Sequence, residues 1–204
     1  MQEIITFSNF YDNPSQMKDL FNNLDFVKNE NMLKGSVCPL PFANDDMLNH
    51  MCQLVNAPRD SLEFVENSGV FIRNMAQDIP SRTVTTHFPS NDTQWVGILY
   101  MSDSKESHYL NFYKHQFYNF DSIIIPKERY TELGIYSHTD LENFIDQENI
   151  DFENKWSLTT RIEMKFNTLI LFRPWLFHSY SDVFGDDINN CRLLQLFFLK
   201  PKQP

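Results

Sequence analysis

The hydrophobic periodicity of the sequence changes near Val70, and this change constrains the fold more than any other feature. Before Val70, apolar residues recur at helical spacing, whereas after it short apolar runs alternate with polar turns. The β-type runs are "GVFIRNMA", "SRTVTTHF", "QWVGILYMSD", "SHYLNFYKHQF", "WSLTTRIEMKF", "TLILFR" and "RLLQLFFLK". Several short strands preceded by helices predict a mainly β fold, a β-sandwich or jelly roll, with N-terminal helices packed on its outside.

The segment before this point predicts one strand and up to three helices. Residues 4–9 alternate between two sets of side chains, as in a strand. Asn13 and the proline that follows it are typical of a helix start, and Asn44 is expected to cap a second helix. A third, shorter helix is expected after Pro58.

No repeat, linker or low-complexity segment divides the chain, so its 204 residues are expected to form one domain. Residues 1–69 would supply the N-terminal strand and helices, and residues 70–204 the β core with one helical insertion at "HTDLENFIDQE". Hydrophobic residues make up 42% of the chain and aromatic residues 15%, which is ample for a single core.

Charge and cysteine content argue against several classes of function. The net charge of −10 is unsuited to sequence-independent binding of nucleic acid or of an anionic membrane surface. The three cysteines lack the spacing of a disulfide framework or a zinc site, which favours a reducing compartment. Because no signal-peptide pattern and no run of roughly 20 apolar residues is present, we expect a cytoplasmic protein.

The segment "NTLILFRPWLFHSYSDVFGDDINNCRLLQLFFL" brackets a polar loop between two apolar runs. The loop opens with His178 and closes with Arg192, and His87 stands where another predicted strand meets a turn. Two imidazoles and usually one carboxylate hold non-haem Fe(II), and a guanidinium can bind a dicarboxylate beside the metal with two hydrogen bonds. The spacing alone favours a hydrogen-bonded core histidine and a solvent-facing arginine.

The order of several segments makes the sequence similar to a known family. "ITFSNFYDNPSQMKDLF", "QWVGILYMSD", "HYLNFYKHQF", "NTLILFRPWLFHS" and "RLLQLFFL" together resemble the Fe(II)/2-oxoglutarate-dependent oxygenases, specifically small prolyl-4-hydroxylase-like members, over most of the chain. The resemblance implies a double-stranded β-helix core. It also implies an enzyme that uses Fe(II), 2-oxoglutarate and O2 to oxidise, most simply to hydroxylate, an unactivated C–H bond.

Matching positions in these segments suggest a role for four residues. By this resemblance His178 is the distal iron ligand and His87 the first iron ligand. Arg192 corresponds to the residue that binds the C5 carboxylate of 2-oxoglutarate, and Tyr100 to a phenol that often contacts the same carboxylate. The other histidines are expected to be structural or solvated, although His108 and His115 could line a pocket.

One departure from the family pattern leaves the third iron ligand open. The first motif of the family is His-x-Asp or His-x-Glu, but "THFPSND" places Pro89 where the carboxylate belongs. Asp92 could reach the metal through a reshaped turn. Alternatively, the site has two histidines only, as in halogenating members in which a halide takes the vacant position. The third possibility is that the site is inactive or that the first ligand lies elsewhere in the sequence. A non-catalytic β-helix binding module is the alternative to an enzyme.

The substrate is not specified by any motif. A small molecule or an amino-acid-like group is the default, and neither a nucleic-acid partner nor a membrane partner is expected from the charge. The sequence leaves the oligomeric state unassigned.

Overall fold

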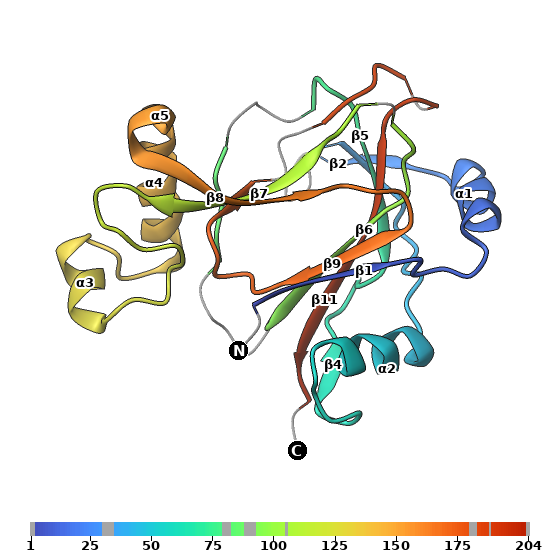
Figure 1. Cartoon of the computed structure of the whole chain (residues 1–204), viewed down its shortest axis with the longest axis horizontal. Helices are drawn as coiled ribbons and strands as arrows, with labels where there is room; N and C mark the ends of the chain where they lie inside the picture. The colour runs from blue at the N-terminus through green and yellow to red at the C-terminus, as the bar shows by residue number, and fades with distance from the viewer. Residues whose placement is uncertain are drawn as a thin grey trace.

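The structure is a computed structural model, and it describes residues 3–29, 35–78, 83–87, 93–104, 106–179, 183–187 and 189–202. Two antiparallel β-sheets form its centre, with the helices around them (Figure 1). The larger sheet consists, in spatial order, of β1 (Ile4–Ser8), β9 (Thr168–Phe172), β6 (Trp95–Tyr100), β11 (Arg192–Pro201), β5 (Val70–Asn74), β3 (Gly35–Val37) and β2 (Val27–Asn29). A short strand, β4 (Leu62–Phe64), pairs with the end of β11.

The smaller sheet has the order β10 (His178–Ser179), β7 (Tyr109–His115) and β8 (Trp156–Glu163). A bridge between Thr85 and His178 adds residues 83–87 beside β10. The helices are α1 (Pro14–Asn22), α2 (Asp45–Leu54), α3 (Lys127–Glu132), α4 (His138–Ile150) and α5 (Phe152–Lys155). Figure 1 shows α3, α4 and α5 at one end of the molecule, beside β7 and β8, and α1 and α2 toward the other.

Apolar side chains fill the space between the two sheets. Successive residues of a strand point to opposite faces, so alternate residues of β6 and β11 face this space. We call the set the interior cluster, and its buried members are Val70, Ile72, Val96, Ile98, Tyr100, Leu110, Phe112, Ile170, Phe172, Leu176, Leu194 and Leu196. Each fully buried aliphatic or aromatic side chain contributes about 1.5–3 kcal/mol, so this cluster is a main reason that the sheets stay together.

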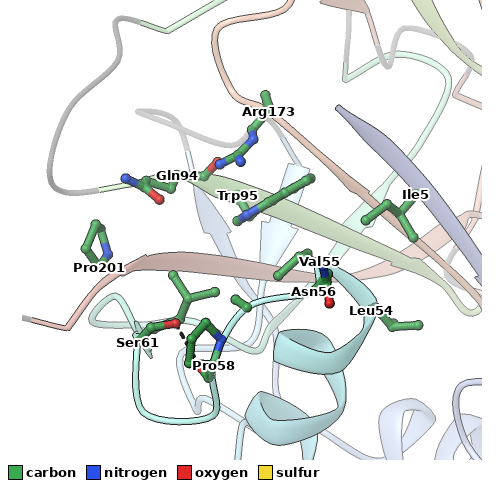
Figure 2. A pocket seen from close by; sticks show the side chains of 12 residues that line it. Ile5, Leu54, Val55, Asn56, Pro58, Ser61, Gln94, Trp95, Arg173 and Pro201 are labelled. Atoms are coloured by element: carbon green, nitrogen blue, oxygen red, sulfur yellow. Dashed lines mark hydrogen bonds between the residues drawn. The ribbon is translucent and has the colours of Figure 1, made fainter. Parts of the chain in front are cut away.

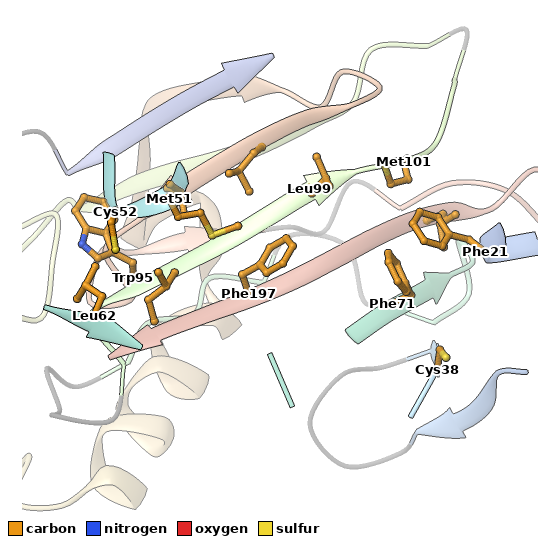
Figure 3. Packing of buried hydrophobic residues seen from close by; sticks show 14 residues of the cluster. Phe21, Cys38, Met51, Cys52, Leu62, Phe71, Trp95, Leu99, Met101 and Phe197 are labelled. Atoms are coloured by element: carbon orange, nitrogen blue, oxygen red, sulfur yellow. The ribbon is translucent and has the colours of Figure 1, made fainter. Parts of the chain in front are cut away.

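The opposite face of the larger sheet is covered by the N-terminal helices. Phe21 of α1 is fully buried there against Phe71 of β5, and Met51 of α2 is fully buried in the same cluster as Leu99 and Phe197 of the sheet (Figure 3). The side chain of Asn44 accepts a hydrogen bond from the backbone N–H of Met47 and so caps α2. The expected packing of N-terminal helices outside the sheet is therefore confirmed.

Helix α4 covers the outer face of the smaller sheet. Leu141 and Ile145 lie on one face of the helix, one turn apart, and pack with Phe177 and Trp156 in a third cluster. Asn149, near the end of the helix, hydrogen-bonds the N–H and the C=O of Val84. The helix therefore holds the segment 83–87 in place beside β10.

Most of the expected elements are present, but one expected helix is wrong, and several short elements, among them helices α3 and α5, were not predicted. The strand at residues 4–8, the helices after Asn13 and Asn44, and the insertion helix α4 are confirmed. The helix expected after Pro58 is wrong, because residues 58–61 form a turn that leads directly into β4. Strands β2, β3 and β4 were not predicted, since each has three residues and no clear alternation. No helix within the described ranges is long and apolar enough to cross a membrane.

Candidate metal and carboxylate site

His178 lies between the two sheets with a fixed tautomer. Its side chain is 2% exposed, and its ring packs edge-on against Phe172 with 4.7 Å between ring centres. Nδ1 lies 2.7 Å from the backbone carbonyl of Leu176. A carbonyl oxygen only accepts hydrogen bonds, so Nδ1 carries the hydrogen and Nε2 carries the lone pair. This is the arrangement in which a histidine binds a metal through Nε2 while a backbone group orients the ring.

His87 reaches the same space from the neighbouring segment. The N–H of His87 donates to the carbonyl of Pro174, and Thr85 pairs with His178 through two backbone hydrogen bonds. In this antiparallel pairing, residues 85 and 87 point to the same face as His178. The two imidazole rings have centres 6.1 Å apart and planes inclined by 46°. The structure therefore brings together the two histidines that the sequence suggested as iron ligands.

Both imidazoles are held in the neutral state. The pKa of His178 is lowered to about 3, first by burial and then by nearby His87, against the opposing effect of the hydrogen bond to Leu176. His87 remains accessible to solvent, yet the protein groups around its ring lower its pKa, first by desolvation and then through His138. The carboxylate of Glu142 acts in the opposite direction. Neutral imidazole is the form that binds a metal, so the electrostatics of the pair suit ligation.

The separation of the two rings is compatible with one shared ion after a small movement. A metal about 2.1 Å from an imidazole nitrogen lies about 3.2 Å from the ring centre. Two rings in neighbouring coordination positions then have centres about 4.5–5 Å apart, and two rings on opposite sides about 6.4 Å. At 6.1 Å, the observed pair falls within this range. A shift of His87 by about 1–1.5 Å would bring it to the neighbouring position, and His87 is the more exposed of the two.

Arg192 and Tyr100 lie on the facing, larger sheet. Arg192 is 1% exposed and begins β11 on the same face as Leu194, a member of the interior cluster. Its Nη2 donates to Oδ1 of Asn74, which is its register partner on β5, over 2.8 Å. Tyr100 is also 1% exposed and stands opposite Leu194, so it is a diagonal neighbour of Arg192. Diagonal neighbours in a sheet lie roughly 7–8 Å apart, close enough for both side chains to contact one carboxylate.

The remaining suggested ligand cannot be placed. Asp92 and Pro89 both lie outside the described residues. Among the residues that the structure does describe, no group of three His, Cys, Asp or Glu side chains is placed to hold a metal ion. Within those ranges the candidate centre therefore consists of His87 and His178, and a further ligand has to come from elsewhere.

Two contributors to the site were not evident from the sequence. Asn74 ends the apolar run "VFIRN" and reads as the first residue of a turn, but it supports the guanidinium of Arg192. The Leu176 carbonyl that orients His178 is a backbone group, which no residue pattern can indicate.

His115, suggested as a pocket residue, is instead fully buried outside this space, where its Nε2 donates to Glu148 over 2.8 Å.

Solved structures similar to this one give the fold an independent reference. HygX from Streptomyces hygroscopicus, with nickel and 2-oxoglutarate bound, matches with a TM-score of 0.54 and 12% identity over 98% of this chain and 83% of HygX. HygX with nickel, 2-oxoglutarate and hygromycin B bound matches with a TM-score of 0.51 and 14% identity over the same shares. This chain has the fold of HygX.

That likeness confirms, at the level of the fold, the resemblance inferred from the sequence. HygX has also been solved with iron bound, and that structure matches with a TM-score of 0.50 and 12% identity over 98% of this chain and 82% of HygX. The mainly β architecture of this chain, with antiparallel sheets and a few helices, is confirmed with it. The sequence itself matches no family model and no curated protein, so the relationship is visible in three dimensions rather than in sequence identity.

Proposed function

We propose that this protein is an Fe(II)- and 2-oxoglutarate-dependent oxygenase, built as a single domain over residues 1–204. His87 and His178 are its iron ligands, and Arg192 with Tyr100 binds the C5 carboxylate of 2-oxoglutarate. The reaction is the oxidation, most simply the hydroxylation, of an unactivated C–H bond by O2. The observation that carries the proposal is the pair of neutral imidazoles, His87 and His178, between two sheets whose fold is that of HygX.

The strand connectivity supports a double-stranded β-helix core in residues 70–204. Along the chain, β5 lies in the larger sheet, residues 83–87 in the smaller, β6 in the larger, and β7 and β8 in the smaller. The chain then continues with β9 in the larger sheet, β10 in the smaller and β11 in the larger. Eight segments thus divide equally between two facing sheets, with the order β5-β11-β6-β9 in the larger one. Strands β1 to β4 extend the larger sheet beyond this core.

The interior offers subsites for a metal and for a carboxylate at two different depths. His178 contacts Phe172 at one end of β9, whereas Tyr100 pairs with Thr168 at the other end. Four residues of strand separate these positions by roughly 13 Å. A five-carbon dicarboxylate, together with an extended arginine side chain, is long enough to span this separation. 2-Oxoglutarate would therefore extend from the imidazole pair toward Arg192.

The residues of this chain would bind and orient the reactants. Bound Fe(II) would supply the activation of O2, with 2-oxoglutarate as the source of electrons. Arg192 offers a forked guanidinium, which matches a carboxylate with two parallel hydrogen bonds, and Asn74 fixes one of its nitrogens. The interior cluster excludes water from the carboxylate subsite. The electrostatic attraction between Arg192 and a bound carboxylate is therefore stronger there than in water. His178, held by the Leu176 carbonyl, is the rigid ligand, and His87 the adjustable one.

The third protein ligand divides the proposal into two forms. In the first, Asp92 supplies the carboxylate and the enzyme hydroxylates its substrate. In the second, the site has two histidines, a halide completes it, and the enzyme halogenates. The second form rests on Pro89 at the motif position and on the two-histidine centre among the described residues. We favour the first, because two neutral imidazoles leave the charge of a divalent ion without an anionic protein ligand.

A small molecule or an amino-acid-like group is the proposed substrate. HygX has been solved with hygromycin B bound, which supports a substrate of that kind. The net charge of −10 argues against a nucleic-acid or anionic membrane substrate. The number of cysteines is odd, which is unsuited to a disulfide framework, and this supports a reducing compartment and a cytoplasmic enzyme.

Metal reconstitution tests the proposal. The purified protein is loaded with Fe(II) without oxygen, desalted and analysed for iron, and then supplied with 2-oxoglutarate and O2. We expect one iron per chain and slow consumption of 2-oxoglutarate with release of succinate, even without a substrate. If the folded protein retained no iron, the oxygenase proposal would be rejected, and a non-catalytic binding module would be the remaining interpretation. Retention of iron without any consumption of 2-oxoglutarate would reject the oxygenase reaction but not the metal site.

A further inference from the structure

A cavity of about 590 Å³ lies on the face of the larger sheet opposite the interior cluster (Figure 2). It opens between the end of α2 and Trp95, and the described residues that line it include neither His87, nor His178, nor any residue of α4. The cavity is therefore not part of the candidate metal site. Groups that support the two histidines have to come from the elements packed around the smaller sheet.

Helix α4 is the element that packs beside the segment carrying His87. Asn149 bonds both the N–H and the C=O of Val84, which fixes the end of the helix at the start of residues 83–87. From Val84 to His87 an extended chain advances by about 10 Å. From Asn149 back to Glu142 a helix also spans about 10 Å, in nearly two full turns, so both side chains lie on the same side of it. A helix that runs antiparallel to the segment therefore places Glu142 beside His87.

The electrostatics of His87 show that α4 runs in this direction. His138, the first residue of α4, lowers the pKa of His87, and the carboxylate of Glu142 acts in the opposite sense. Coulomb interactions fall with distance and are largely screened beyond about 10 Å, so both side chains lie close to the ring. The start of α4 is thus beside His87, as its end is beside Val84.

The carboxylate of Glu142 is held only weakly where it is. Its Oε1 lies 3.4 Å from Nε2 of His138, one turn before it, and the two side chains are 61% and 58% exposed. Exposed pairs of this kind contribute little, so the flexible glutamate can turn toward His87 at low cost. Among the described residues no group of three His, Cys, Asp or Glu side chains is placed to hold a metal ion, and Glu142 is therefore not assigned as a ligand itself.

A histidine that binds a metal through one ring nitrogen usually donates its other N–H to a carboxylate or a carbonyl. For His178 this acceptor is the Leu176 carbonyl. Within the described ranges the ring of His87 has no such partner, and Glu142 is the carboxylate that acts on it. The two histidines thus differ in how they are oriented.

We propose that Glu142 is a positioning residue for His87: when His87 binds the metal, this carboxylate accepts a hydrogen bond from the other ring nitrogen. The inference rests on the proposed function, because it takes His87 as an iron ligand. A carboxylate in this place fixes the ring and makes its metal-binding nitrogen more basic. It also brings a negative charge near a divalent ion that two neutral imidazoles leave unbalanced.

The affinity for Co(II), followed by its visible absorption in place of Fe(II), tests this role. Glu142→Ala should weaken Co(II) binding by about 10- to 100-fold. Glu142→Gln keeps an acceptor oxygen but not the charge, and should bind Co(II) about threefold or more tightly than Glu142→Ala. Glu132→Gln is the matched control, because Glu132 is 58% exposed and is also paired within its own helix, with Arg129 at 2.6 Å. It should bind Co(II) like the wild type.

Because Glu142 is exposed, its variants should fold, and a melting curve of each metal-free protein checks this. Wild-type affinity in Glu142→Ala would overturn the inference while leaving the iron site intact. An equal loss in Glu142→Gln and Glu142→Ala would also overturn it, since charge alone and not a hydrogen bond to His87 would then be responsible. So would an equal loss in Glu132→Gln. A wild-type protein that binds no Co(II) would instead reject the proposed metal site, and the inference with it.

Discussion

Replacing Arg192 by alanine should remove most of the affinity for 2-oxoglutarate. The guanidinium is 1% exposed and hydrogen-bonded to Asn74 at 2.8 Å, so a carboxylate paired with it would be shielded from water. Truncating one partner of a buried, hydrogen-bonded charge pair costs about 2–5 kcal/mol. At about 1.4 kcal/mol per factor of ten, the expected loss of affinity is roughly 30-fold to several thousand-fold.

The assay is a calorimetric titration of 2-oxoglutarate into the Fe(II)-loaded protein without oxygen. Arg192→Lys keeps the charge but not the fork, and should fall between the wild type and Arg192→Ala. Arg161→Ala, which removes an exposed arginine from the other sheet, should leave the affinity unchanged. Because the alanine also deprives Asn74 of its donor, about 1–3 kcal/mol of folding stability should be lost, and a melting curve has to show that the variant is folded. A folded Arg192→Ala with wild-type affinity would refute the assignment.

Three other substitutions test separate parts of the structure. Asp92→Ala should weaken iron binding by about an order of magnitude without recovery on adding chloride, if Asp92 is the anionic ligand. His115→Gln should lower the free energy of unfolding by about 1–3 kcal/mol at pH 7.5, because the buried ring donates to Glu148. Asn167→Ala should cost about 2–3 kcal/mol, because Asn167 has a φ of 55° and its side chain bonds the N–H and the C=O of Tyr11.

Each of these has a definite contrary result. If Asp92→Ala binds iron like the wild type, and chloride perturbs the metal spectrum of the wild type, the two-histidine halogenating form is favoured.

Burial lowers the pKa of His115 below 6.5. The stability that His115 contributes is therefore present above that pH and is lost as the pH falls through the folded-state pKa. Equal stability of His115→Gln and the wild type in denaturant titrations at pH 7.5 would contradict this. Asn167→Gly should recover the backbone part of the loss, and no recovery would exclude the positive φ as a cause.

The fold was largely predictable because its strands are long enough to show a pattern. The runs that became β6, β9 and β11 are mainly apolar, since both faces of the larger sheet are covered. The three-residue strands β2, β3 and β4 have too few positions for any period to appear. The turn after Pro58 was mistaken for a helix because proline at a first helical position and proline at the start of a turn look the same in sequence.

The site was predictable only where side chains carry the chemistry. His178 and Arg192 stand out because a polar loop separates two apolar runs, and the structure buries both. That His87 lies beside His178 follows from the pairing of Thr85 with His178, a contact between residues 93 positions apart that no local pattern contains. The support from Asn74 and from the Leu176 carbonyl is equally non-local or carried by the backbone.

The most direct test of the proposed iron site is the metal content of His178→Ala after anaerobic loading with Fe(II). His50→Ala is the control, because His50 is a residue of α2 and packs against Phe7 on the far face of the larger sheet. Loss of one of two neutral imidazole ligands should reduce bound iron to about one tenth or less of the wild-type value, while His50→Ala retains it. Full retention of iron by a folded His178→Ala protein would contradict the metal site and, with it, the oxygenase function proposed for this chain.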